Sequence, residues 1–492
     1  MVVTRDNLHQ LASQKLGDRL LIVVSNREPY VHTFSGGAIE CLVPASGLTV
    51  ALDPVMRACG GTWVAHGSGD ADREVVDSNS KVLVPPKEPA YSLRRVWLSK
   101  EQEDGYYYGF SNQALWPLCH IAYVRPLFDE AQWETYKAVN ELFADTVCSE
   151  MGDRKAFVFI QDYHLALLSR MIKERKPDVI TAQFWHIPWP NREAFRVCPW
   201  QEELLDGLLG NDLLGFQIRY HCNNFLDTID RTIEAKVDYE RYEVTRGGKK
   251  TAVHPFPISI DFEEINSTAH GEDVLEAMHS FRQLLGLDNQ FIGLGLDRID
   301  YTKGILERFR AFDRFLVKYP QYEGKAVLIQ AGVPSRVHIN AYKLLNEEVD
   351  SLAEEINWRH ASGRWKPIIY LRRHLSPTAL LALRRLAHFM VVSSLHDGMN
   401  LVAKEYVASR SDEDGVLILS PFTGAARELT DAMLVNPYAP DEFAEAIKTA
   451  LEMPREERRT RMRRMRGIIE ENNIYKWAAD ILAHMTGLDQ RE

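Results

Sequence analysis

The chain has 492 residues, of which 45% are hydrophobic, 26% charged and 10% aromatic. This composition excludes a disordered chain, a fibrous repeat and a disulfide-stapled miniprotein, and the length suits two large α/β domains as well as three small ones. The net charge of −11 gives no support to nucleic-acid or membrane-surface binding, so an anionic substrate needs a local cluster of cations.

The N-terminal residues show neither a secretion signal nor a membrane span. The longest apolar run there covers residues 20–24, far short of the ~20 residues that cross a bilayer. The six cysteines are scattered and form no CxxC pair, which is typical of reduced thiols and argues against a zinc site. We therefore expect a cytoplasmic protein.

Short apolar runs alternate with segments of helical periodicity along the whole chain. In the first half, buried parallel strands are predicted at 20–25, 157–160, 179–185 and 213–216. In the second half they are predicted at 291–296, 326–330, 367–371, 389–393 and 416–420. Helices are predicted over 136–147 and 341–356. This alternation predicts an α/β fold with doubly wound parallel sheets.

The predicted hinge lies at residues 254–260, where two prolines follow a polar stretch, 245–251, that reads as a loop. We therefore predict an N-terminal Rossmann-like domain over 1–255 and a C-terminal one over 256–471. A last amphipathic helix, about 472–492, must pack on something, and returning to the first domain is one option.

Ligands of open α/β sheets bind beyond the carboxyl ends of the strands, so the loops there are the candidate sites. Arg27 follows the first strand, and Asp162 and His186 follow two later ones. Gly47 lies in one of two glycine-containing loops further on. The alternative to a functional role is that Arg27 is an ordinary surface arginine and that His186 is a hydrogen-bonded histidine of the core.

The second half offers a denser set of cations. Arg298 and Lys303 share one strand-to-helix connection, and Arg336 follows the next strand. Two cations beside the N–H groups of a helix start suit a diphosphate, although solvated charges at a sheet edge remain the alternative. Further on, Asp397 is expected in a loop, with residues 398–402 starting a helix and Glu405 about two turns into it. A carboxylate at that depth can accept hydrogen bonds from both hydroxyls of a ribose. The alternative, a Glu405 side chain that is simply exposed to solvent, is given equal weight.

Several familiar motifs are absent. The sequence has no HExxH and no Walker phosphate loop, and no serine–histidine–acid set stands out. Two DxD matches, Asp70/Asp72 and Asp412/Asp414, fall in polar stretches and are interpreted as turns. The site is therefore predicted to be cationic and metal-free, with Arg298 and Lys303 stabilising a leaving phosphate.

Long motifs in a fixed order carry a resemblance over nearly the whole chain. They are SNRE at 25, FSNxxLWP at 110, QDYHL at 161, HIPWP at 186, LLGFQ at 213, DRIDYTKG at 297 and DGMNLVAKEYV at 397. With these motifs the chain resembles the trehalose-6-phosphate synthase family, glycosyltransferase family 20. The resemblance implies a GT-B fold, two Rossmann-like domains across a cleft, and transfer that retains anomeric configuration. Near its first tryptophan motif the chain differs from the family pattern, with His66 close to the place of a second tryptophan.

The resemblance also implies roles for individual residues. Arg298 and Lys303 would hold the donor diphosphate and Glu405 the ribose. Asp397, together with the backbone of Met399, Asn400, Leu401 and Val402, would hold the transferred glucose and its phosphates. Gly47 and His186 would lie near the donor sugar. Asp162 would bind an acceptor hydroxyl, and the acceptor phosphate would lie among Arg27, Tyr107, Trp116 and Arg336.

The expected reaction is glucosyl transfer from a nucleotide-glucose, with UDP-glucose favoured, to glucose 6-phosphate, with no cofactor. The alternatives are a glucosylglycerol-phosphate synthase, which would use glycerol 3-phosphate, and a non-catalytic sugar-phosphate sensor. A dinucleotide-dependent oxidoreductase and a glycan phosphorylase lack their motifs here. The nucleotide base stays open, and a homo-oligomer is neither predicted nor excluded.

Overall fold

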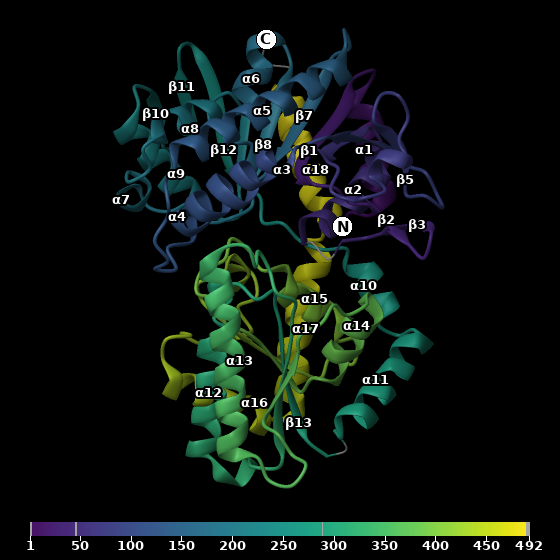
Figure 1. Cartoon of the computed structure of the whole chain (residues 1–492), viewed down its shortest axis with the longest axis vertical. Helices are drawn as coiled ribbons and strands as arrows, with labels where there is room; N and C mark the ends of the chain where they lie inside the picture. Colours follow the sequence, from purple (N-terminus) through teal and green to yellow (C-terminus); the bar gives the residue numbers. More distant parts are fainter. Residues whose placement is uncertain (1, 45–46, 288, 489–492) are drawn as a thin grey trace. The chain divides into compact units, whose positions relative to one another are not determined.

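The computed structural model describes residues 2–44, 47–287 and 289–488 (Figure 1). The chain divides into two compact units: the first runs to Ile258 and resumes at Ile474, and the second is Ser259–Asn473. This division lies three residues beyond the end predicted for the first domain, and the last helix belongs to the first unit. None of the helices among the described residues is long and apolar enough to span a bilayer.

The first unit is built on a ten-stranded sheet in the order β10-β11-β12-β9-β8-β7-β1-β4-β6-β5. The seven strands from β12 to β6 in this order are parallel: β12 (Lys249–Pro255), β9 (Leu213–Phe216), β8 (Ile180–Trp185), β7 (Ala156–Gln161), β1 (Leu20–Arg27), β4 (Thr62–His66) and β6 (Tyr91–Val96). The antiparallel edge strands are β10 (Lys236–Asp238), β11 (Glu243–Arg246) and β5 (Lys81–Val84). A separate hairpin pairs β2 (Val31–Ser35) with β3 (Ala38–Leu42).

The second unit has a six-stranded, wholly parallel sheet. Its order is β15 (Ile368–Leu371), β14 (Ala326–Ala331), β13 (Phe291–Leu296), β16 (Phe389–Val392), β17 (Val416–Leu419) and β18 (Met433–Leu434). In both units the chain starts in mid-sheet, adds strands to one side and then crosses to the other. The crossing points, β1/β7 and β13/β16, are where the loops part and a ligand site forms.

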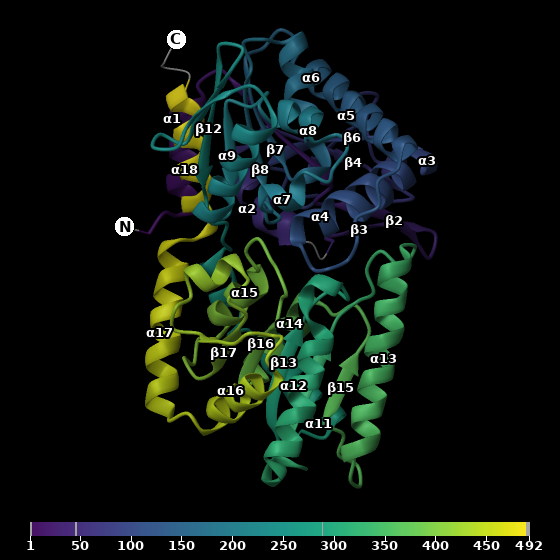
Figure 2. The same cartoon turned by 90° about the vertical axis from the view of Figure 1, so that its left-hand side faces the viewer.

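Helices complete each unit. In the first they are α1 (Arg5–Leu16), α2 (Gly47–Cys59), α3 (Lys100–Glu103), α4 (Trp116–His120), α5 (Glu130–Met151), α6 (Leu168–Arg175), α7 (Arg192–Phe195), α8 (Gln201–Leu208), α9 (Arg219–Thr232) and α18 (Ile474–Leu488). In the second they are α10 (Phe262–Thr268), α11 (Glu272–Leu285), α12 (Ile305–Lys318), α13 (Asn340–His360), α14 (Pro377–Leu386), α15 (Leu401–Ser409), α16 (Pro440–Glu452) and α17 (Arg455–Glu471). Figure 2 shows α12 and α13 side by side next to β15, where α12 buries Phe309, Phe312 and Phe315.

Helix α18 returns to the first unit and packs against α1, α2 and β8 (Figures 1 and 2). Its Trp477 is buried, and the ring lies 5.2 Å from that of Phe184 and 5.9 Å from that of Phe159. The indole N–H donates to the Phe256 carbonyl at 3.1 Å. The apolar stripe of this helix therefore covers the first sheet, the option that the sequence left open.

One local prediction was wrong and another was incomplete. Residues 245–251, read as a polar loop, form the turn and flanking residues of the β11–β12 hairpin, whose Gly247 and Gly248 have positive φ. Asp72, read as part of a turn, is fully buried and ion-paired with Arg95. In both cases the deciding partner is a strand that a local reading of polarity does not reveal.

Candidate functional site

In the second unit, the connection between β13 and α12 carries the first predicted cations. Asp300 lies at its centre, fully buried, and caps the short helix η4 (Tyr301–Lys303) by accepting the Thr302 N–H at 3.0 Å. Arg336 Nη1 lies 3.4 Å and Arg298 Nη2 4.0 Å from Asp300 Oδ2. Arg298 also donates to the Ser335 hydroxyl at 3.3 Å.

All three predicted cations act on the ionisation of Asp300. Burial raises the pKa of this carboxyl, but Arg336, Arg298 and Lys303 outweigh it and hold the pKa below its usual value. Arg298 keeps about a third of its side chain exposed, whereas Arg336 is largely buried. The connections after β13 and β14 thus place two arginines beside one buried carboxylate.

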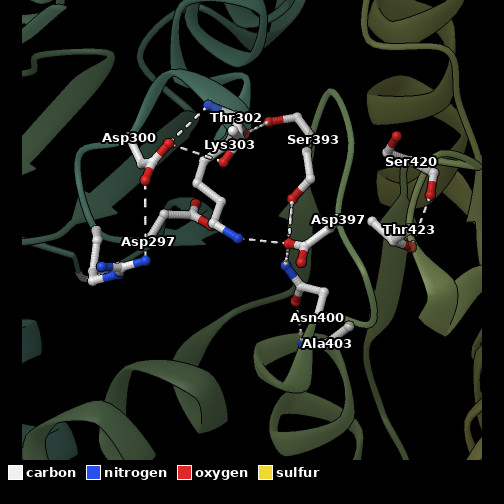
Figure 3. A network of polar contacts seen from close by, with 12 residues as sticks. Asp297, Asp300, Thr302, Lys303, Ser393, Asp397, Asn400, Ala403, Ser420 and Thr423 are labelled. Atoms are coloured by element: carbon white, nitrogen blue, oxygen red, sulfur yellow. Dashed lines mark hydrogen bonds and ion pairs between the residues drawn. The ribbon is translucent and has the colours of Figure 1, made fainter. Parts of the chain in front are cut away.

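The loop after β16 meets this site at Asp397. Lys303 Nζ lies 2.6 Å from Asp397 Oδ2, which also accepts from the Asn400 amide at 3.1 Å. Figure 3 shows the Lys303 amine and the Asn400 amide both directed at the Asp397 carboxylate. The two loops flank the β13/β16 crossing point, so the structure brings Arg298, Lys303, Arg336 and Asp397 to one edge of one sheet.

The helix start in this loop differs from the prediction. Helix α15 begins at Leu401, with Asn400 as its N-cap at φ 88° and a side chain that accepts the Ala403 N–H at 3.0 Å. Met399 is therefore in the loop, and Leu401 and Val402 form the first helical positions. Glu405 is the fifth residue of the helix, about one turn in rather than two. Its carboxylate is paired with Arg384 of α14.

In the first unit, Arg27 and Tyr107 meet after β1. Arg27 is exposed and its Nη2 donates to the Tyr107 hydroxyl at 2.7 Å. Both residues line a pocket of about 200 Å³, together with His66, Ser68, Glu28 and others. Tyr107 comes from η2 (Asp104–Leu115), a π-helix, and Trp116 begins the following helix. π-Helical turns are frequent at functional sites.

Asp162 and His186 are also adjacent, at the ends of β7 and β8. Asp162 Oδ1 accepts the backbone N–H of His186 at 3.2 Å, and the imidazole Nε2 lies 2.9 Å from the Gln161 side-chain oxygen. Desolvation lowers the pKa of His186 to about 3, so the imidazole ring is neutral. Part of the residue still reaches solvent. Asp162 has φ 71° and ψ 177°, a conformation that glycine alone adopts readily.

Trp116 and Gly47 are the remaining residues predicted in the first unit. Trp116 is buried, with its ring 4.0 Å from that of His120 and 5.9 Å from that of Tyr163. Gly47 is the first residue of α2. Arg336 belongs to the second unit, whereas Arg27, Tyr107 and Trp116 belong to the first. That these four share one acceptor phosphate stays a prediction.

A buried charged cluster beneath the pocket was missed. Arg95 is 2% exposed, and its guanidinium lies 2.8 Å from Glu28 Oε2 and 2.7 Å from Asp72 Oδ1. Glu28 also accepts the Ser68 N–H at 2.8 Å. Burial and the neighbouring Asp72 raise the pKa of Glu28 to about 8. The acidic Glu28 directly after Arg27 was the available signal, since a carboxyl group that follows a buried strand needs a polar partner.

Comparison with known proteins places this geometry in context. The model of a family described as glycosyltransferase family 20 matches residues 19–486. The trehalose-6-phosphate synthase of Mycobacterium avium is 37% identical, over 95% of this chain and 95% of its own length. A bifunctional trehalose-6-phosphate synthase/phosphatase of Thermoproteus tenax is 36% identical over 94% of this chain, which spans 63% of that longer protein.

Solved structures agree over both units. The E. coli enzyme bound with UDP-2-fluoro glucose is 33% identical, with a TM-score of 0.84, covering 95% of this chain and 98% of that one. A UDP-forming trehalose-phosphate synthase of Burkholderia xenovorans in complex with glucose-6-phosphate is 31% identical, with a TM-score of 0.84, covering 95% and 99%. The predicted GT-B fold class is thereby confirmed.

Proposed function

Because the chain belongs to glycosyltransferase family 20, we propose that it is a retaining glucosyltransferase that moves glucose from UDP-glucose to glucose 6-phosphate, forming trehalose 6-phosphate and UDP. The observation that carries this proposal is the gathering of Arg298, Lys303 and Arg336 at the crossing point of the second sheet, where the two arginines lie beside Asp300 and the lysine lies beside Asp397. Such a site suits a diphosphate. The relatives bound to a UDP-glucose analogue and to glucose-6-phosphate support the choice of substrates.

The cations act on the leaving group. As the bond between the glucose anomeric carbon and the diphosphate oxygen breaks, Arg298 and Lys303 stabilise the charge that develops on the phosphate. The acceptor hydroxyl oxygen bonds to the same face of that carbon, and its proton passes to an oxygen of the leaving diphosphate. Since the two cations neutralise the phosphate charge, we propose that the reaction needs neither a metal nor a cofactor. Full activity in excess EDTA is the expected outcome.

On the acceptor side, we propose that Asp162 orients the attacking hydroxyl while Arg27 and Tyr107 bind the phosphate. A guanidinium beside a phenol hydroxyl supplies hydrogen-bond donors for the oxygens of a phosphate. The neutral His186 then acts as a hydrogen-bonding group near the donor sugar rather than as a charged acid. A cytoplasmic location is proposed with it, because all six cysteines are free thiols.

The decisive experiment pairs UDP-, GDP- and ADP-glucose with glucose 6-phosphate, glycerol 3-phosphate and fructose 6-phosphate. Nucleoside diphosphate release is followed, and the product anomer is identified by NMR. We expect release with UDP-glucose and glucose 6-phosphate, and an α,α-linked product. Release of nucleoside diphosphate only with glycerol 3-phosphate would show that this compound, not glucose 6-phosphate, is the acceptor. If no pairing gives acceptor-dependent release, the result would support a non-catalytic sugar-phosphate sensor.

A further inference from the structure

A fully buried arginine lies beneath the two loops of the second unit. Arg308, on α12, is 1% exposed, and its guanidinium reaches the carboxyl ends of three strands. Nη2 lies 2.7 Å from Asp297 Oδ2 after β13, Nη1 donates to the Gln330 side-chain oxygen on β14, and Nε donates to the Ser393 hydroxyl after β16 at 3.1 Å. One side chain thus joins β13, β14 and β16 at the edge where the cations gather.

Ser393 extends this connection into the cation loop. Its hydroxyl accepts from Arg308 and lies 2.8 Å from the Gly304 carbonyl oxygen and 3.1 Å from that of Lys303. The backbones also lie against each other, since a Cβ on Gly304 would come within 2.1 Å of the Ser393 carbonyl oxygen. The Leu395 N–H donates to the Thr302 carbonyl at 2.7 Å. The loop with Lys303 and the loop with Asp397 are therefore hydrogen-bonded to each other, and Ser393 connects both of them to Arg308.

The charge of Arg308 is costly to bury, and stability alone gives little reason to keep it. Apolar side chains of similar volume often replace a buried ion pair without loss of stability. The guanidinium offers what an apolar side chain lacks, a rigid set of donors that can engage three partners at once. Because Arg308 lies at the carboxyl edge of the sheet, this geometry can fix the positions of the loops that carry Lys303 and Asp397.

We propose that Arg308 is a positioning residue that holds the Lys303 loop and the Asp397 loop in register, so that the second unit recognises a diphosphate rather than a single phosphate. Arg308 touches no substrate and acts through Asp297 and Ser393. The inference rests on the proposed function, because it assumes that a nucleoside diphosphate binds between these loops. Loss of the Arg308 guanidinium should therefore weaken binding of the nucleoside diphosphate more than binding of the nucleoside monophosphate.

The test measures the affinities of UDP and UMP by calorimetry in wild type and Arg308→Met. The matched control is Arg410→Met, because Arg410 is a comparably buried arginine of the same unit that donates to the Ala387 and Arg385 carbonyls and pairs with Asp412. We expect the preference for UDP over UMP to fall about tenfold in Arg308→Met and to stay at the wild-type value in Arg410→Met, since small displacements of binding groups carry large penalties.

A preference retained by Arg308→Met, or lost equally in both variants, would overturn the inference. If Arg308→Met does not fold, Ser393→Ala decides, because it removes the hydroxyl that links the arginine to the Gly304 and Lys303 carbonyls. We expect a lowered preference there too, and an unchanged one would overturn the proposal. Failure of the proposed function looks different, because the wild-type protein itself would then show no preference for UDP and no glucosyl transfer.

Discussion

Asp162 combines a strained backbone with a predicted role at the acceptor, and two substitutions separate the two properties. With φ 71° and ψ 177°, this residue occupies a region that costs a non-glycine residue about 1–3 kcal/mol. Asp162→Ala keeps the strain, whereas Asp162→Gly removes it. Both variants lose the carboxylate and its bond to the His186 N–H, so that loss cancels when the two are compared.

The expected difference follows from two opposing terms. Relief of the strain favours glycine by about 1–3 kcal/mol, and the greater freedom of glycine in the unfolded chain takes back about 0.4–1 kcal/mol. At the centres of these two ranges, Asp162→Gly should therefore be more stable than Asp162→Ala by about 1.3 kcal/mol, the reverse of the usual order. Neither variant should transfer glucose at more than about 1% of the wild-type rate, because the acceptor hydroxyl loses its orienting carboxylate.

Urea unfolding followed by tryptophan fluorescence measures this difference in the correct unit. Of the ten tryptophans, only Trp358 and Trp365 belong to the second unit, so the signal reports mainly on the first. An alanine variant as stable as the glycine variant would refute the strain. A glycine variant with near-normal turnover would refute the acceptor role of Asp162 while leaving the strain intact.

Three further predictions address charge, pH and packing. Arg298→Ala and Lys303→Ala should each lower kcat by about 100-fold or more at an unchanged urea midpoint, and near-normal turnover in either would contradict phosphate stabilisation. For His186 the folded-state pKa of about 3 lies below the 6.5 of the unfolded chain, so only the unfolded state is protonated between them. The unfolding free energy should thus rise with pH across this window by up to about 1.4 kcal/mol per unit, and His186→Gln should flatten the rise; an equal slope in the variant would count against a neutral ring. Trp477→Ala should destabilise the first unit by about 3–5 kcal/mol, against less than about 0.5 kcal/mol for Trp358→Ala, whose side chain is 88% exposed.

Much of the fold could be predicted because its strands are buried on both faces. The run of residues 291–296 coincides with β13, and 213–216 coincides with β9. A buried strand needs apolar residues throughout, so its ends are sharp in the sequence. The polar residues that follow then lie at the ligand-binding edge, which is why the loops that carry Lys303 and Asp397 could both be predicted as candidate sites, whereas the 2.6 Å contact between the two side chains could not.

The parts that could not be predicted depend on partners far away in the chain. Asp72 looks like a turn residue among its neighbours, and its burial against Arg95 on β6 cannot be predicted from them. Glu405 was placed one helical turn too deep, because the start of α15 is set by the Asn400 cap in a left-handed conformation. Arg308 has no local signal at all, since its three partners come from loops and strands spread over nearly a hundred residues.

The return of α18 to the first unit affects how the protein folds during synthesis. The residues that cover Phe159 and Phe184 leave the ribosome only after the 215 residues from Ser259 to Asn473. At about 5–20 residues per second, this delay is on the order of 10 to 40 s. During that time the N-terminal sheet carries an uncovered apolar face while the second unit can already fold. A nascent chain halted near residue 473 should therefore bind a chaperone that recognises exposed apolar surface, and release it once the last helix has emerged.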